Sequence, residues 1–262
     1  MRPRPLETFA LLLTSLPIWA AGPIDTDGPD FVESSEVVGN ARFQYEAELT
    51  QERDRRIPSS RTTTATPTLL KYGIADTVEL RVQTEGYIRV ADESGGASDS
   101  PRTGLGDTAL GLKWHSQDRD ASAGKPAISW ILHFDTPSGT KGFEGQGIRP
   151  SLRSVMTWDL PHDLSLGVMP GMKYDTDGEG RRFTSGIFGT VLNKRLSDKL
   201  RAFVELSAPQ LARNQNGGTL ASWDVGAARL LTDDTQIGVR AGVAANRNTP
   251  NASLLFELAQ RY

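Results

Sequence analysis

The chain has 262 residues, a formal net charge of −3 and no cysteine, which excludes a disulfide framework, a thiolate metal site and a thiol nucleophile. The slightly acidic balance provides no electrostatic footprint for nucleic acid, and no apolar run beyond the N-terminus is long enough for a transmembrane helix. A membrane β-barrel is compatible with this composition, because alternating strands average to a hydrophilic sequence.

The N-terminus predicts a secretory signal peptide over residues 1–21. Arg2 and Arg4 precede an apolar stretch over residues 9–19, and small residues follow from Ala20, which is the order found in export signals. The alternative is a buried N-terminal helix. Export of a chain without cysteine favours a bacterial envelope protein.

The segment from Val78 to Val90 shows the pattern that decides the fold class. Every second residue is apolar or small, whereas those between are Glu79, Arg81, Gln83, Glu85, Tyr87 and Arg89. A soluble sheet buries its apolar face and shows its polar face to water. A membrane barrel instead turns apolar side chains to lipid and lines its lumen with charged ones.

The same alternation recurs down the chain. In order, the predicted strands cover about 41–50, 62–72, 78–90, 108–115, 127–135, 152–158, 164–174, 183–194, 200–206, 223–227, 237–243 and 254–262. Pro67 predicts a bulge in the second of them. The count predicts a single antiparallel up-and-down transmembrane β-barrel of about 12 strands over residues 41–262, preceded by a periplasmic segment over residues 22–40.

The connections alternate in length, which is a second indication of a membrane barrel. Longer loops rich in Gly, Asp and Arg are expected at about 51–61, 92–104, 136–150, 175–182, 209–218 and 246–252, with mostly short turns between them. In transmembrane barrels the short turns are periplasmic and the longer loops extracellular, and an even strand number leaves both termini in the periplasm.

Aromatic residues on the apolar face give a third indication. They are expected near the periplasmic ends of their strands, where an interfacial girdle would lie, and comprise Tyr72, Trp114, Trp130, Trp158 and Tyr262. The main alternative is a soluble antiparallel sandwich or lipocalin-like barrel. That fold would need one closed core for the large side chains of about twelve strands.

Charged residues on the opposite face are expected to line the lumen. They are Arg42, Glu46, Glu79, Arg81, Glu85, Arg89, Lys113, Arg153, Arg201, Glu205, Asp224, Arg240 and Glu257. Both signs occur on neighbouring strands, so cross-strand ion pairs are expected. One interpretation is a narrow, water-filled, charge-lined conduit. The alternative is a closed structural barrel, in which these pairs fill the lumen.

A hydrolase at the outer rim is a further alternative. His133 has Asp135 two residues further along the same face, and Asp107 is expected across the hairpin. Asp and His at such a rim are the residue types with which omptin proteases activate water. His115 would lie about 20 Å from His133, at ~3.3 Å per residue, and cannot share that site.

Several motifs resemble those of an outer-membrane transporter family associated with the MetA pathway of phenol degradation. They are the segment Gly-Leu-Gly-Asp-Thr-Ala-Leu-Gly-Leu-Lys-Trp at 104–114 and the turns at 71–76 and 195–200. The terminal strand ending in Tyr262 is similar to the signal read by barrel-assembly machinery. The resemblance covers about residues 35–262. It implies an outer-membrane location and uptake of hydrophobic or aromatic compounds, and it supplies no catalytic residue.

We therefore expect a bacterial outer-membrane channel for passive passage of small molecules through a charge-lined lumen. The expected partners are outer-membrane lipid, the barrel-assembly machinery and a small-molecule solute. We predict no enzyme, catalytic residue, cofactor, metal site or nucleic-acid partner. The alternatives are the hydrolase using His133 and Asp135, the closed structural barrel and a soluble periplasmic binding protein.

Overall fold

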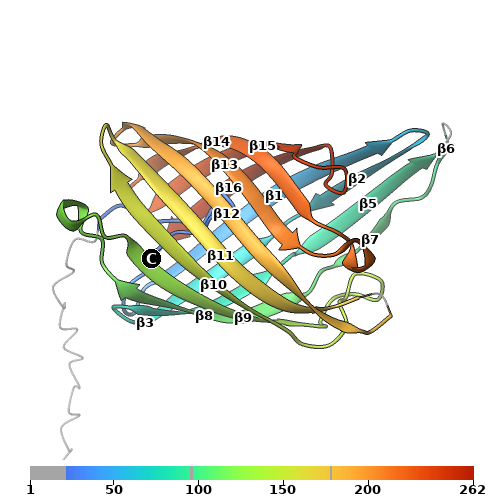
Figure 1. Ribbon diagram of the computed structural model, residues 1–262, viewed down its shortest axis with the longest axis horizontal. Helices are drawn as coiled ribbons and strands as arrows, with labels where there is room; N and C mark the ends of the chain where they lie inside the picture. The colour runs from blue at the N-terminus through green and yellow to red at the C-terminus, as the bar shows by residue number, and fades with distance from the viewer. Residues whose placement is uncertain (1–21, 95–96, 178) are drawn as a thin grey trace, which may run out of the picture.

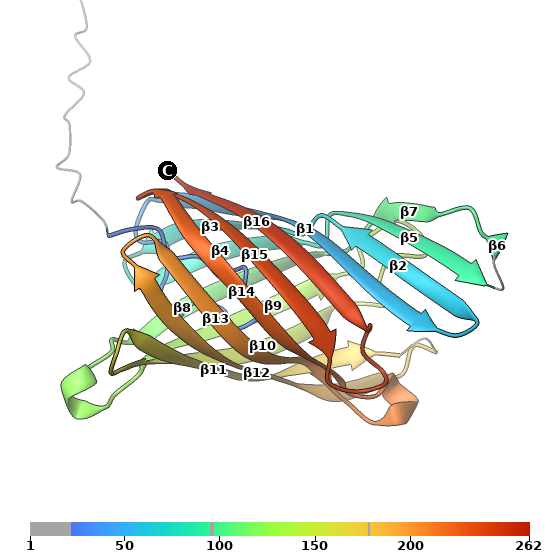
Figure 2. The same ribbon diagram turned by 90° about the horizontal axis from the view of Figure 1, so that it is seen from above.

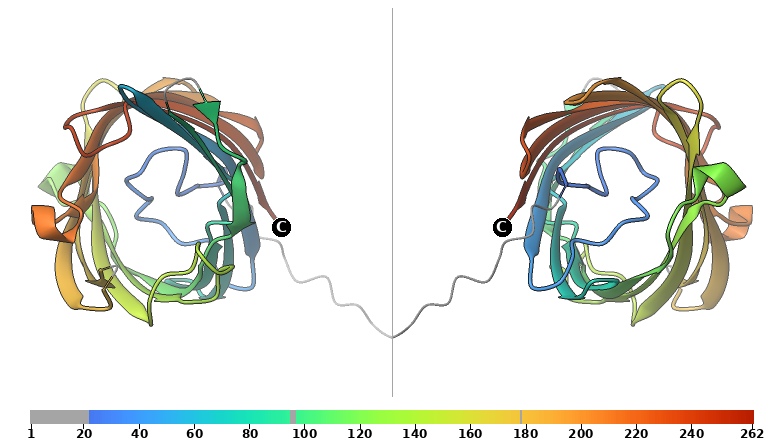
Figure 3. Two further views of the ribbon diagram at one scale, coloured as in Figure 1. Left: turned by 90° about the vertical axis from the view of Figure 1, so that its right-hand side faces the viewer. Right: turned by 90° about the vertical axis from the view of Figure 1, so that its left-hand side faces the viewer.

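The computed structural model describes residues 22–94, 97–177 and 179–262, so the predicted signal peptide lies outside the described residues. Within these ranges the chain forms a closed antiparallel barrel of 12 strands, in which the last strand pairs with the first (Figures 1 and 3). The barrel strands are β1 (Phe43–Arg56), β3 (Thr68–Ala75), β4 (Val78–Thr84), β8 (Thr108–Gln117), β9 (Ala127–Thr136), β10 (Arg149–Leu160), β11 (Leu164–Thr176), β12 (Arg182–Ser197), β13 (Leu200–Leu211), β14 (Leu220–Thr232), β15 (Thr235–Ala244) and β16 (Ala252–Arg261). The predicted barrel is confirmed.

A sheet of shorter strands extends the barrel at one end (Figure 2). It contains the outer part of β1 together with β2 (Ser59–Ala65), β5 (Tyr87–Ser94), β6 (Ala97–Ser98) and β7 (Arg102–Leu105). The sequence predicts loops at 51–61 and 92–104, whereas the structure has strands over most of both ranges. The difference arises because these strands project beyond the apolar belt and lack its alternation.

A register shift separates this extension from the barrel. Thr68 pairs with Thr84, but Ala65 pairs with Ile88, so three steps on one strand match four on the other. The extra residue lies at 85–86, which is a β-bulge. The bulge predicted at Pro67 is therefore wrong in its position, since the register with β1 is continuous across that residue.

Gly86 makes this bulge possible. Its φ is +67°, and a Cβ at this position would lie 2.0 Å from the Thr66 carbonyl oxygen. Only glycine adopts this conformation without strain and also leaves room for a neighbouring backbone at that distance.

The outer face of the barrel is apolar and the inner face is polar, as the alternation predicts. On β4, Leu80 and Val82 are exposed, whereas Glu79 and Arg81, which alternate with them, are buried. The aromatic residues predicted for the girdle lie toward the short-turn end. Tyr72, Trp114, Trp130 and Tyr262 are exposed, and Trp158 is half-buried. Exposed apolar side chains in a continuous belt are the surface that a membrane barrel presents to lipid.

The connections are short at one end of the barrel and longer at the other. Turns at 76–77, 161–163, 198–199 and 233–234 lie at the short-turn end, which also contains the connection with the 3₁₀ helix η1 (Ala121–Ala123). The second 3₁₀ helix, η2 (Asn214–Asn216), lies at the opposite end. Among the described residues, no helix has the length and apolar character needed to cross a membrane. Short periplasmic turns and longer extracellular loops are the arrangement of outer-membrane barrels.

Candidate functional site

Residues 22–42, which we call the lumen segment, run inside the barrel at its short-turn end before the chain enters β1 (Figure 3). The sequence predicts a periplasmic segment over 22–40, whereas the structure places these residues within the lumen. Several of them are almost fully buried there, including Ile24, Thr26, Asp27, Val32 and Ser35. Contacts between the lumen segment and the barrel wall hold the segment in this position.

Asp27 is the centre of a buried ion-pair cluster. Its carboxylate lies 2.9 Å from Lys113 Nζ, 3.1 Å from Lys71 Nζ and 3.0 Å from an Arg81 guanidinium nitrogen. Burial opposes ionisation of Asp27, but Lys113, Lys71 and Arg81 together hold its pKa well below the ordinary value. Asp27 is therefore a charged anchor of the segment.

Two further carboxylates of the segment contact the wall. Glu33 lies 2.7 Å from Arg81 and also pairs with Arg153 on β10. Asp30 lies 2.7 Å from Arg201 on β13. The segment is thus held by ion pairs to strands on different sides of the barrel.

Wall carboxylates accept hydrogen bonds from the backbone of the segment. Phe31 N–H and Val32 N–H donate to Glu205 at 2.8 and 2.7 Å, and Val38 N–H donates to Glu79 at 2.8 Å. Buried backbone N–H groups need acceptors, and the irregular segment lacks the strand partners that would otherwise provide them. Glu79 and Glu205 therefore position the segment in addition to lining the lumen.

An apolar contact completes the attachment. Val32 packs in a buried cluster with wall residues Ile131, Val155, Met169, Val191 and Phe203, and Phe31 lies against it. Gly167 and Gly189 leave room for these two side chains, because a Cβ at Gly189 would lie 2.7 Å from Val32 Cγ2. This patch is not predicted from the sequence, because the inner face is expected there to be charged.

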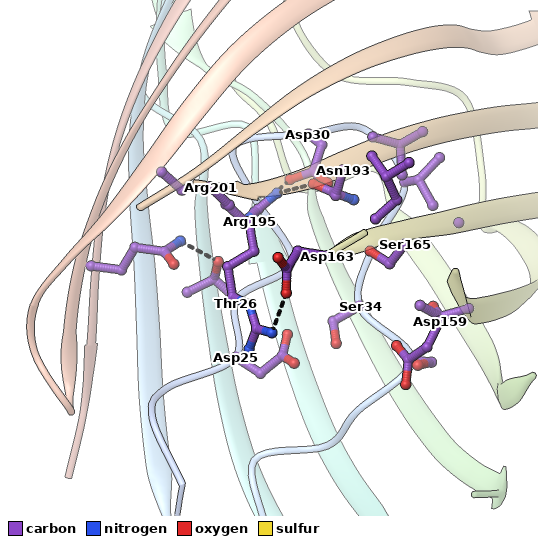
Figure 4. A pocket seen from close by; sticks show the side chains of 18 of the residues that line it. Asp25, Thr26, Asp30, Ser34, Asp159, Asp163, Ser165, Asn193, Arg195 and Arg201 are labelled. Carbon is purple, nitrogen blue, oxygen red and sulfur yellow. Dashed lines mark hydrogen bonds and ion pairs between the residues drawn. The ribbon is translucent and has the colours of Figure 1, made fainter. Parts of the chain in front are cut away.

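Cavities lie on both sides of the lumen segment. The larger, of about 680 Å³, opens toward the short turns. It is lined by residues that include Asp25 of the segment, Asp163 of the 161–163 turn and Arg195 near the end of β12 (Figure 4). The smaller, of about 190 Å³, lies on the other side and is lined by residues that include Glu48 and Arg240. Asp30 and Glu33 border both cavities.

The other predicted lumen residues take up different positions. Glu46 on β1 is buried, pairs with Lys71 and accepts a hydrogen bond of 3.0 Å from Asp27 N–H. Asp224 is buried, and its carboxylate accepts hydrogen bonds from Ser207 and Ser222 at 2.7 and 3.0 Å. Glu257 and Arg240 are also on the inner wall, and each has a buried side-chain atom without a hydrogen-bond partner, Oε1 and Nε respectively.

Three predicted residues do not lie on the inner face of a barrel strand. Arg42 is the last residue of the lumen segment, between the turn at 40–41 and β1, and Glu85 is exposed in the bulge. Arg89 is placed differently from its prediction: it shares the outer face with exposed Tyr87, because the bulge advances the alternation by one residue.

The predicted hydrolase residues are not assembled into a site. His133 is buried, and its Nδ1 accepts a hydrogen bond of 2.9 Å from Arg153. Asp135 pairs with Lys173 at 2.8 Å, and Asp107 pairs with Arg149 at 2.6 Å. A histidine that accepts from arginine and is withdrawn from solvent is a poor general base.

These features define the protein as a β-barrel of the bacterial outer-membrane class with a segment of its own chain in the lumen. Residues 26–262 match the family described as "Putative MetA-pathway of phenol degradation", and the chain belongs to this family. The resemblance inferred from the motifs is confirmed. No curated protein matches the sequence significantly.

Solved structures share the fold at low sequence identity. An outer membrane channel from Pseudomonas putida F1 is 12% identical, with a TM-score of 0.66 over 87% of this chain and 98% of that one. The β domain of the Bordetella autotransporter BrkA is 11% identical, with a TM-score of 0.53 over 85% of this chain and 99% of that one.

Proposed function

We propose that the protein is an outer-membrane channel through which small molecules pass passively, and that the lumen segment narrows the path near its periplasmic end. The observation that carries this proposal is the closed barrel with an apolar exterior, a polar interior and cavities on both sides of the segment. A structural neighbour with the same barrel is described as an outer membrane channel. The family's description supports an aromatic or hydrophobic solute.

The location and assembly are part of the same proposal. The exposed apolar belt fits outer-membrane lipid. The last strand, which ends in Tyr262 and closes the barrel against β1, would be the element read by the barrel-assembly machinery. Export would depend on residues 1–21.

Planar-bilayer conductance tests the channel. We expect discrete, ohmic steps from the detergent-refolded full chain, and larger steps from a variant lacking residues 22–40. Heat-modifiable gel migration is the folding control. The double variant Asp27→Asn/Glu33→Gln, which keeps the segment but removes two of its charged anchors, replaces the deletion if that fails to fold. A folded barrel that conducts in neither form is a closed structural barrel, and the channel proposal then fails.

His133→Ala separates the channel from the hydrolase alternative. The substitution removes the acceptor of the Arg153 hydrogen bond but leaves the barrel closed, so we expect conductance to persist. Hydrolysis of a peptide or ester substrate that disappears in His133→Ala would instead support an enzyme.

A further inference from the structure

The lumen segment is an anionic peptide whose carboxylates face cations of the barrel wall. Between residues 22 and 40 it has five carboxylates and no Lys or Arg. Three of these carboxylates, Asp27, Asp30 and Glu33, form ion pairs with the wall residues Lys71, Arg81, Lys113, Arg153 and Arg201. Lys71 and Arg81 also pair with the wall carboxylates Glu46 and Glu79, so the segment supplies only part of the negative charge around these two cations.

Two of these cations depend on the segment. Among the ion pairs of the described residues, Lys113 has Asp27 as its carboxylate partner and Arg153 has Glu33. Lys113 is fully buried. An unpaired charge in such an environment is costly, so departure of the segment favours the entry of another anion.

Ile131 joins these cations to the apolar patch. It is the register partner of Lys113 on one side and of Arg153 on the other, so it lies between them. It also belongs to the buried cluster that receives Val32. The cationic and apolar parts of the wall are therefore one continuous surface.

We propose that the lumen segment occupies the binding site of the channel's solute, and that this solute is a carboxylate with an apolar or aromatic body. This inference rests on the proposed channel function and names its substrate class. The solute carboxylate takes the place of Asp27 or Glu33 beside Lys113 and Arg153. The apolar body takes the place of Phe31 and Val32.

The solute must compete with a tethered segment. A peptide joined to its site by a short tether has an effective local concentration in the millimolar range. Displacement is therefore expected at high solute concentration and is readily reversed, which suits passage through a channel. A neutral aromatic lacks the charge to replace Asp27, and a small carboxylate lacks the body to replace Phe31 and Val32.

The absence of cysteine provides a direct reporter. Ser35 is 1% exposed, and its carbonyl oxygen accepts a hydrogen bond from Ser129 and contacts His115 Nδ1 at 2.8 Å. In Ser35→Cys the thiol is buried while the segment is seated and reacts with a charged maleimide when the segment leaves. Ser122→Cys, in the exposed η1 turn, is the matched control.

We expect benzoate to accelerate labelling of Ser35→Cys by an order of magnitude or more, with saturation. Benzamide and acetate at the same ionic strength should leave the rate near its starting value. Labelling of Ser122→Cys should respond to none of the three. Heat-modifiable migration shows that each variant is folded.

Several outcomes overturn the proposal. Equal acceleration by benzoate and benzamide removes the role of the charge, and equal acceleration by benzoate and acetate removes the role of the apolar body. If benzoate leaves labelling of Ser35→Cys slow, the solute does not displace the segment. This conclusion holds whether or not Asp27→Asn, added to Ser35→Cys, speeds the labelling. Conductance separates this proposal from the proposed channel function. If the barrel conducts but benzoate does not accelerate labelling, the channel function stands and the proposed solute class is wrong.

Discussion

Asp27 of the lumen segment and Lys113 of β8 lie 2.9 Å apart, and 86 positions separate them in the chain. Both side chains are almost fully buried. A buried pair of this kind has little net stabilising effect when intact, but removal of one partner is strongly destabilising. The segment and the barrel wall are therefore mutually dependent.

Asp27→Asn should loosen the segment. The amide keeps the shape of the side chain but removes the charge that faces Lys71, Lys113 and Arg81. Loss of one partner of a buried pair costs about 3–5 kcal/mol, which weakens the attachment of the segment to the wall. We expect larger conductance steps and a lower urea midpoint.

The matched control for this variant is Asp163→Asn. Asp163 pairs with Arg195 at 2.6 Å, but both side chains are more than half exposed, and exposed pairs add little. Equal effects of the two substitutions would contradict a special role for Asp27.

Gly189→Ala tests the apolar seat independently of charge. A Cβ at this position would lie 2.7 Å from Val32 Cγ2 and 3.0 Å from the Phe31 ring, and the short valine side chain cannot move aside. We expect larger conductance with an unchanged heat-modifiable shift. Gly186→Ala, on the same strand but facing Leu211, should leave conductance unchanged; an increase there would mean that β12 itself is disturbed.

The barrel could be predicted because its signal is local. The alternation of Leu80 and Val82 with Glu79 and Arg81 is present in the sequence and has only one arrangement in a membrane. The same rule placed Arg89 in the lumen, and it failed there because a one-residue bulge reverses the faces of the positions that follow it in the same strand. The glycine at 86 was the available signal for that bulge.

The position of the lumen segment could not be predicted in this way. Residues 22–40 show no alternation, and their location depends on cations that come from distant strands, such as Lys113 and Arg201. The signal that was present is compositional. A stretch with five carboxylates and no basic residue precedes a barrel whose inner face has many Lys and Arg.

Gly86→Ala should disturb the junction between barrel and extension. The added Cβ meets the Thr66 carbonyl oxygen at 2.0 Å, and the φ of +67° is itself unfavourable for alanine by roughly 1–2 kcal/mol. We expect a lower yield of folded, heat-modifiable protein. Gly124→Ala has nearly the same φ, +65°, but no atom within 4 Å of the added Cβ, so it measures backbone strain alone. Similar yields of folded protein from Gly86→Ala and Gly124→Ala would show that the structure relieves the clash with the Thr66 carbonyl oxygen.

Asp107 fixes the loop over residues 137–148 at the long-loop end. Its carboxylate accepts hydrogen bonds from Gly139 N–H at 2.9 Å, Gly145 N–H at 2.8 Å and Arg149 at 2.6 Å. Burial opposes ionisation, but Arg149 and the two amides together hold the pKa of Asp107 below its ordinary value. The loop is therefore held by a charged acceptor.

The sign of this shift predicts how the loop responds to acid. A depressed folded-state pKa gives stabilisation that is complete above the unfolded value of about 3.9 and is lost as the pH falls through the folded value. We expect the amide NMR signals of Gly139 and Gly145 to stay unchanged from neutral pH to about 5 and to titrate with a midpoint below about 3.9. Asp107→Asn should shift both signals at neutral pH, whereas Asp120→Asn, which alters a separate carboxylate in the η1 turn, should shift neither. A midpoint above the ordinary value would show that burial outweighs Arg149 and the two amides, and that Asp107 does not hold the loop through its charge.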